Sequence, residues 1–255
     1  MRFSDGSSPK YGFLKDDSDR IFVLRGDPLF ARIELSGEVF TLDEVRLLSP
    51  VIPRSKVVGV GRNYRDHVEE RGGEVPAEPI FFIKPNTSVI GPDDPIVLPK
   101  WSEKVEPEGE LAVVIKTVAK DVREEDVDNI IFGYTIANDV TARDKQDQDG
   151  QWTRAKGFDT SCPVGPWIVV DPDLDADNLR VTTSVDGEVV QDGSTSDMIF
   201  SVRELVVAAS EAFTLLPGDI ILTGRPAGLQ ALHAGDRVEV TIEDIGSLSN
   251  PVVRR

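Results

Sequence analysis

From residue 56 onward the chain is a succession of short apolar segments of strand type, and this pattern limits its fold more than any other feature. The segments are rich in β-branched residues and are bounded by turn residues. They lie at residues 56–60, 80–83, 111–116, 132–136, 167–170, 181–185, 219–222 and 238–242. Helices do not alternate regularly with them, which argues against a doubly wound βαβ fold. The pattern predicts a β-rich α+β protein.

Two helices are predicted among these strands. Residues 124–131 form a short helix that begins with acidic residues. Residues 201–215 form a longer helix, because Ser201 and Glu204 have the spacing of a capping box and apolar residues then recur at helical intervals. Earlier strand signals at residues 11–14, 20–24 and 31–35 indicate a small N-terminal β module. We therefore predict two domains, residues 1–50 and residues 51–255.

Charge and composition exclude several classes of protein. The formal net charge is -17 and no cluster of Lys and Arg is present, which argues against a nucleic-acid-binding surface. No segment approaches the ~20 apolar residues of a transmembrane helix. The single cysteine, Cys162, rules out an internal disulfide, and the first residues lack the apolar core of a secretory signal. These features predict a cytoplasmic protein that does not associate with membranes.

The first segment with chemical potential contains Glu108 and Glu110, which lead into an apolar strand. Alternate strand residues share a face, so both carboxylates point the same way. Burying two unpaired carboxylates is costly, and a divalent cation would offset that cost. Ligation by oxygen alone favours Mg²⁺, Mn²⁺ or Ca²⁺ over zinc. The alternative is a solvated strand end with two surface glutamates.

The second segment ends an apolar strand with Asp139, a candidate third carboxylate. Arg143 and Gln146 follow four and seven residues later. If a helical turn begins after Asp139, all three side chains share one face. The alternative is a helix cap formed by Asn138 or Asp139.

The third segment places His67 and Glu70 three residues apart, so that they meet on one helical turn. A carboxylate can fix the tautomer of the imidazole and raise its basicity, as a general base requires. The Arg71-Gly72-Gly73 sequence that follows indicates a flexible lid. The alternative is an exposed, charged helix with an idle histidine.

Together these segments resemble the fumarylacetoacetate hydrolase superfamily, across residues 57–253. Its motifs occur in the family's order: GRNYRDHVEE, FFIKP, EGELAVVI, GYTIANDVTARDKQ, AKGFDTSCPVGPW, LLPGDIILTGRPAG and GSLSNPVV. Within the superfamily the chain is most similar to compact bacterial oxaloacetate decarboxylases and acylpyruvate hydrolases. The resemblance implies a mixed β-sandwich roll with a small N-terminal domain, usually assembled as a homodimer.

The resemblance also assigns roles to individual residues. The metal ligands are Glu108, Glu110 and Asp139, and the catalytic residues are His67, Glu70 and Lys156. Substrate contacts are assigned to Tyr64, Lys84, Arg143, Gln146, Thr223 and Arg225. Arg225 is a departure, since many members have Gly-Thr-Pro where this chain has Gly224-Arg225-Pro226. This arginine either pairs with a substrate carboxylate or points to solvent.

The implied function is that of an enzyme dependent on Mg²⁺ or Mn²⁺ that acts on small 2-oxo-acids. The cation would stabilise an enolate while a C–C bond breaks, in oxaloacetate decarboxylation or acylpyruvate hydrolysis. The first alternative is a 2-hydroxyhepta-2,4-diene-1,7-dioate or 5-carboxymethyl-2-hydroxymuconate isomerase, which moves only a proton. A remote alternative is a non-catalytic member that binds a ligand.

Overall fold

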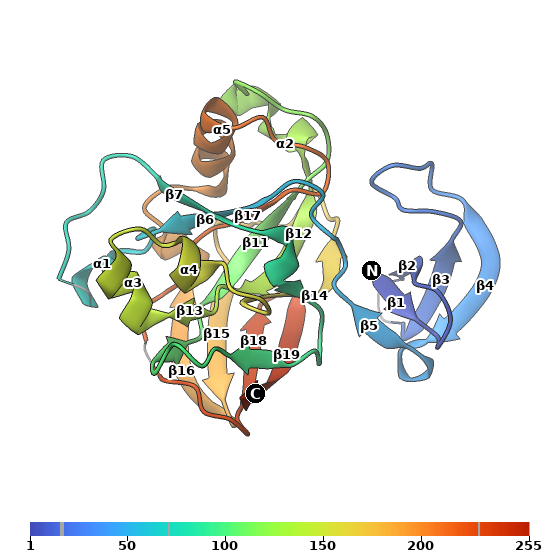
Figure 1. The fold of residues 1–255 in the computed structure, drawn as a ribbon. Coiled ribbons are helices and arrows are strands. Elements are labelled where there is room, and N and C mark those ends of the chain that lie inside the picture. Colours follow the sequence, from blue (N-terminus) through green and yellow to red (C-terminus); the bar gives the residue numbers. More distant parts are fainter. Residues whose placement is uncertain (16–17, 71, 229, 255) are drawn as a thin grey trace.

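The computed structural model describes residues 1–15, 18–70, 72–228 and 230–254, which form a small N-terminal sheet and a larger body (Figure 1). The N-terminal sheet is antiparallel, with the strand order β4-β3-β2-β1-β5. Its strands are β1 (Arg2–Ser4), β2 (Lys10–Leu14), β3 (Arg20–Leu24), β4 (Leu35–Thr41) and β5 (Arg46–Leu48).

A seven-stranded mixed sheet forms the centre of the larger body, in the order β7-β6-β17-β11-β12-β14-β8. Its members are β6 (Val57–Gly61), β7 (Ile80–Lys84), β8 (Val89–Ile90), β11 (Gly109–Ile115), β12 (Ile131–Asn138), β14 (Cys162–Val169) and β17 (Ile220–Leu222). The β6–β17 and β8–β14 pairs are parallel, and the other pairs are antiparallel.

A five-stranded sheet packs against this one, in the order β16-β15-β18-β19-β9. It consists of β9 (Ile96–Leu98), β15 (Arg180–Val185), β16 (Glu188–Ser194), β18 (Arg237–Ile242) and β19 (Gly246–Arg254). A short ribbon joins β10 (Val105–Glu106) to β13 (Thr141–Ala142). The α-helices are α1 (Arg65–Glu70), α2 (Val127–Ile130), α3 (Arg143–Asp149), α4 (Thr153–Lys156) and α5 (Val202–Ala212).

Strand β11 is buried along its whole length, and this fixes the residues at its start. Leu111, Val113 and Ile115 pack into the main core, which includes residues of the five-stranded sheet and of α5. Ala112 and Val114 face the other side, in a cluster that contains Cys162. A strand packed on both faces leaves little freedom to the residues that precede it, because protein interiors are closely packed.

Helix α5 covers one side of the main core and lies at the top of the larger body in Figure 1. The predicted capping box is present: the hydroxyl of Ser201 accepts from the Glu204 backbone N–H, and the Glu204 carboxylate accepts from the Ser201 backbone N–H. The predicted end at residue 215 is wrong. The helix ends at Ala212, because the backbone of Leu215 pairs with Ala119 in both directions.

The β-rich fold class and the small N-terminal domain are confirmed, with two local corrections. The strand expected at residues 31–35 is wrong: residues 28–30 form a turn closed by hydrogen bonds to Asp27, and β4 begins at Leu35. The helix expected at residues 124–131 is a 3-10 turn followed by α2, and Ile131 already belongs to β12. Among the described residues, no helix is both long and apolar enough to cross a membrane.

Candidate functional site

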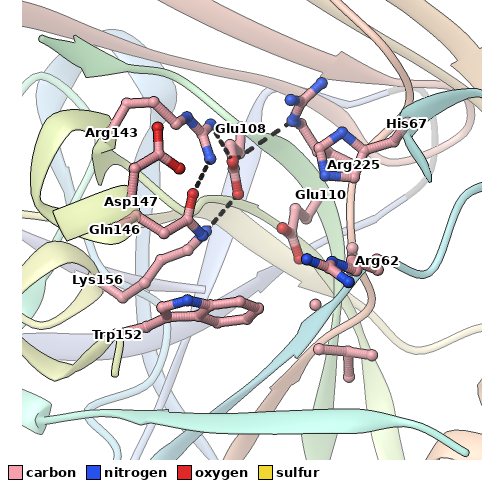
Figure 2. Close-up of a pocket in the computed structure, with 13 residues that line it drawn as sticks. Arg62, His67, Glu108, Glu110, Arg143, Gln146, Asp147, Trp152, Lys156 and Arg225 are labelled. Carbon is pink, nitrogen blue, oxygen red and sulfur yellow. Dashed lines mark hydrogen bonds and ion pairs between the residues drawn. The ribbon is translucent and has the colours of Figure 1, made fainter. Parts of the chain in front are cut away.

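A cavity of about 240 Å³ opens at the ends of the inner strands β6, β11 and β17 of the central sheet, and its lining is mostly charged. Its side chains come from segments far apart in the sequence and converge on one space (Figure 2). The lining residues are Val60, Gly61, Arg62, His67, Glu108, Glu110, Arg143, Gln146, Asp147, Trp152, Lys156, Gly224 and Arg225.

Three carboxylates meet at this cavity because of the register between β11 and β12. Gly109 pairs with Asn138 and Glu110 with Ala137, so Glu108 and Asp139 lie side by side where the two strands meet. The backbone N–H of Asp139 donates to the Glu108 carbonyl at 2.8 Å. One oxygen from each of Glu108, Glu110 and Asp139 lies within 4.8 Å of the other two, and all three residues are buried. We call this group the carboxylate triad.

The triad is electrostatically unbalanced at Glu110. Burial, together with repulsion from Asp139 and Glu108, raises the pKa of Glu110 well above its usual value. Burial also disfavours the charged form of Glu108, but the attraction of Lys156, Arg143 and Arg225 outweighs it and holds the pKa of Glu108 well below its usual value. Glu110 accepts a hydrogen bond from the Gly224 backbone at 2.7 Å. A further positive charge at the triad would therefore stabilise the ionised form of Glu110 more than that of the other two carboxylates.

Lys156, at the end of α4, places a positive charge against the triad. Its Nζ is 2.5 Å from Glu108 Oε2 and 2.5 Å from Asp139 Oδ2. Burial lowers the pKa of Lys156, but Asp139 and Glu108 more than offset this and raise it overall. The ammonium thus occupies a cation position between two members of the triad. With one oxygen of Glu110 within 4.8 Å of an oxygen of each of these two residues, the triad fits a hard divalent cation such as Mg²⁺ or Mn²⁺.

Arg143 binds the Glu108 oxygen that Lys156 does not contact. Its Nε donates to Glu106 at 2.7 Å, its Nη2 to Glu108 at 2.5 Å and its Nη1 to Gln146. Burial opposes its charge, but Glu108 and Glu106 outweigh it and raise the pKa of Arg143. All three guanidinium nitrogens are used, so Arg143 fixes the orientation of Glu108 and Gln146.

The predicted His67–Glu70 pair is formed on α1, with 3.5 Å between His67 Nδ1 and Glu70 Oε2. Burial lowers the pKa of His67 to about 4, and the positive charge of Arg225 adds to this effect. The imidazole is therefore neutral at pH 7. Glu70 also accepts from the Gly228 backbone at 3.0 Å and from Arg225 Nη2 at 3.2 Å. These bonds hold α1 against the segment that follows β17.

Three predicted substrate contacts do not line the cavity. Lys84 is fully buried and donates to Asp139 at 2.7 Å, so it supports the triad. Thr223 donates to the Leu111 carbonyl at 3.0 Å, which ties β17 to β11. Tyr64 is buried. This burial, and to a smaller extent the negative charge of Glu110, raises the pKa of its phenol.

The helical turn that would place Asp139, Arg143 and Gln146 on one face does not begin directly after Asp139. Thr141 and Ala142 form β13 against β10, and α3 begins only at Arg143. Arg143 and Gln146 still reach the cavity, because α3 carries them there. Of the predicted lid segment, Arg71 lies outside the described residues.

Sequence reasoning missed four residues of the site: Glu106, Arg62, Trp152 and Asp147. Glu106 is buried and bound to Arg143, and the two-residue spacing that selected Glu108 and Glu110 also extends back to it. For Arg62 the signal in the sequence is its place directly after the glycine that ends a buried strand; in the structure its backbone has a positive φ of 58°. No local signal in the sequence marks Trp152 or Asp147.

Comparisons with known proteins find matches over nearly the whole chain. A family model described as fumarylacetoacetate (FAA) hydrolase C-terminal matches residues 56–253, and one described as Rv2993c-like, N-terminal matches residues 1–50. The chain is 53% identical over 232 residues to Protein Rv2993c of Mycobacterium tuberculosis, covering 90% of this chain and 85% of that protein.

Two other similar proteins carry functional names. Over 235 residues the chain is 43% identical to the Homo sapiens protein named oxaloacetate tautomerase FAHD2A, mitochondrial, covering 88% of this chain and 75% of that one. The crystal structure of a 5-carboxymethyl-2-hydroxymuconate delta-isomerase from Mycobacterium smegmatis superposes with a TM-score of 0.91 at 44% identity. That match covers 100% of this chain and 98% of the other.

Proposed function

The chain belongs to the fumarylacetoacetate hydrolase family, and on that premise we propose that it enolises a small 2-oxo-acid with the help of a divalent cation. The observation that carries the proposal is the presence, in one cavity, of a neutral imidazole and a cluster of buried carboxylates. Keto–enol tautomerisation and double-bond isomerisation can both use this combination, because each moves a proton at a carbon beside an oxo group: the imidazole can accept the proton, and a cation held by the carboxylates can stabilise the enolate.

The carboxylate triad supplies the cation site. Glu108, Glu110 and Asp139 would hold Mg²⁺ or Mn²⁺, which acts when bound as a Lewis acid toward the carboxylate and 2-oxo oxygens of the substrate. The other residues of the cavity bind the substrate, orient it and move the proton.

His67 is the proposed base. Its pKa, lowered to about 4 by burial and by Arg225, keeps it able to accept a proton near neutral pH. Glu70, 3.5 Å from Nδ1, sets the orientation of the ring and stabilises the imidazolium once it forms. Lys156 places an ammonium beside the triad, where negative charge develops on the oxygen of the substrate.

The second candidate is C–C bond cleavage through the same enolate. The hydrolase name of the family model favours this reaction. So do the three cationic side chains around Glu108, namely Arg143, Lys156 and Arg225, because positive charge stabilises an enolate leaving group. Decarboxylation of oxaloacetate needs no water. Hydrolysis of an acylpyruvate needs His67 to activate one.

One experiment separates these reactions. The protein is stripped with a chelator, Mn²⁺ or Mg²⁺ is restored, and the enol form of oxaloacetate is added. Loss of the enol absorbance and release of pyruvate are then followed in the same sample. Enol loss that is faster than pyruvate release supports proton transfer. Equal rates indicate decarboxylation, and pyruvate release from acetylpyruvate indicates hydrolysis. Turnover no faster than that of the free metal in all of these assays would refute the proposal.

A further inference from the structure

Each carboxylate of the triad has one oxygen that is bound by a donor from another part of the chain. The three donors belong to α3, to the backbone that follows β17 and to β7, so separate elements hold the triad. The bound oxygens are Glu108 Oε1, which accepts from Arg143 Nη2 at 2.5 Å, Glu110 Oε2, which accepts from the Gly224 N–H at 2.7 Å, and Asp139 Oδ1, which accepts from Lys84 Nζ at 2.7 Å.

The Lys156 ammonium contacts the opposite oxygens of two of these carboxylates. It lies 2.5 Å from Glu108 Oε2 and 2.5 Å from Asp139 Oδ2. Figure 2 shows this division at Glu108, where dashed lines lead to both Arg143 and Lys156. A cation in place of the ammonium would therefore take one oxygen from each carboxylate without breaking a bond to any of the three donors.

Lys84 is held firmly against Asp139. Its side chain is completely buried at the end of β7, and its Nζ donates to the backbone carbonyl of Lys156 as well as to Asp139. A buried ammonium that loses its acceptors is costly, so both bonds should persist when a cation enters the site. Asp139 is thereby limited to one ligand oxygen, Oδ2.

The number of oxygens that a site can offer helps to decide between Ca²⁺ and Mg²⁺. Ca²⁺ takes about six to eight oxygens in flexible arrangements and can bind both oxygens of one carboxylate, whereas Mg²⁺ is smaller, requires octahedral geometry and usually keeps several waters. A triad that offers one oxygen per carboxylate suits Mg²⁺. The triad also has little room to expand, because β11 is buried along its whole length.

We propose that Lys84 is a specificity-determining residue that makes the triad select Mg²⁺ over Ca²⁺, because it withholds Asp139 Oδ1 from the bound ion. The inference rests on the cation site of the proposed function and adds which ion that site rejects. Lys84 thus has a role that differs from the substrate contact assigned to it by the family resemblance. It acts on the choice of ion through Asp139, with no contact to the substrate.

The test measures how Mg²⁺ and Ca²⁺ displace Mn²⁺ from the full-length protein, without any substrate. The protein is loaded with Mn²⁺, each competing ion is titrated in, and the released Mn²⁺ is followed by its electron paramagnetic resonance signal. In the wild type, Mg²⁺ is expected to displace Mn²⁺ at a concentration about tenfold lower than Ca²⁺ does. Equal or better displacement by Ca²⁺ would refute the inference, and this comparison needs no variant.

Two lysine variants separate the number of ligand oxygens from the charge of the site. Lys84→Met and Lys156→Met each remove one positive charge beside Asp139, but Lys84 binds Oδ1 and Lys156 binds Oδ2. Both variants should therefore bind both ions more tightly than the wild type. Only Lys84→Met should also shift the ratio of the two affinities, by about tenfold toward Ca²⁺, because only this change frees a second oxygen of Asp139.

A ratio that is unchanged in Lys84→Met, or that shifts equally in Lys156→Met, would refute the inference. Failure of the inference can be distinguished from failure of the proposed function. Mn²⁺ binding without a preference for Mg²⁺ over Ca²⁺, in a protein that enolises 2-oxo-acids, would leave the function standing without the selectivity. A preference for Mg²⁺ that depends on Lys84, in a protein that enolises no 2-oxo-acid, would support the selectivity and refute the function.

Discussion

Replacing Glu110 with glutamine should have opposite effects on the metal-free and the metal-loaded protein. The triad oxygens lie within 4.8 Å of one another, and at an effective dielectric constant of ~20 two unit charges at that distance repel by roughly 3.5 kcal/mol. Lys156 offsets part of this repulsion. We therefore expect Glu110→Gln to stabilise the metal-free protein by about 1–2 kcal/mol near neutral pH.

The gain should depend on pH with a definite sign. Burial and the two neighbouring carboxylates raise the folded-state pKa of Glu110 above its unfolded value. The stability that protonated Glu110 contributes is therefore complete below its unfolded pKa, near 4.5, and is lost as pH rises through the raised folded pKa. Glutamine cannot titrate, so the advantage of the variant over the wild type should grow across that range.

With metal bound, the wild type should be more stable than Glu110→Gln, which is the reverse of the order expected without metal. A ligand at 100 times its Kd adds about 2.7 kcal/mol to the folded state. For a chain of this size that corresponds to a rise in Tm of about 5–11 °C. Glu110→Gln removes one of three carboxylate ligands and should lose most of this rise.

Thermal unfolding with chelator and with Mn²⁺ provides the assay, and Glu188→Gln is the matched control at an exposed position. A variant that is less stable than the wild type in chelator, or that keeps the full Mn²⁺-induced shift, would show that Glu110 is not a strained metal ligand.

Three further outcomes are expected. His67→Gln should lower turnover by about 10²- to 10⁴-fold and leave the Mn²⁺-induced Tm shift intact. Because the pKa of His67 is lowered to about 4, the activity of the wild type should not decline as pH falls through 6.5, where an ordinary histidine becomes protonated. Lys156→Met should bind Mn²⁺ roughly tenfold more tightly in a calorimetric titration, since its ammonium competes for Glu108 and Asp139; equal or weaker affinity would contradict that competition. Ser201→Ala should cost about 1 kcal/mol in denaturant unfolding through loss of the α5 cap, and no change would contradict the capping assignment.

The carboxylate triad was predictable because it depends on local patterns. Glu108 and Glu110 lead into an apolar run, and Asp139 ends another. Once those runs pair as β11 and β12, the three carboxylates must meet. The His67–Glu70 pair follows from a single helical turn. Family membership is confirmed by the match over residues 56–253.

The contacts around the triad could not be derived from local patterns, because they join distant parts of the chain; it was the family resemblance that assigned Lys156 to the site. Lys156 lies 48 residues from Glu108 in the chain, and Arg143 lies 37 residues from Glu106. Nothing local indicates that Lys84 would bind Asp139. The direction of Arg225 was open in the sequence and is inward in the structure, where the residue is 2% exposed. The homodimer and the choice between Mg²⁺ and Mn²⁺ stay predictions.

The metal centre supports the whole functional account, and anomalous diffraction from a crystal grown with Mn²⁺ tests it most directly. The account predicts one strong anomalous peak per chain, within bonding distance of Glu108, Glu110 and Asp139, with the Lys156 ammonium displaced from its place between Glu108 and Asp139. A triad without a peak at saturating Mn²⁺, with Lys156 still bound to Glu108 and Asp139, would contradict it.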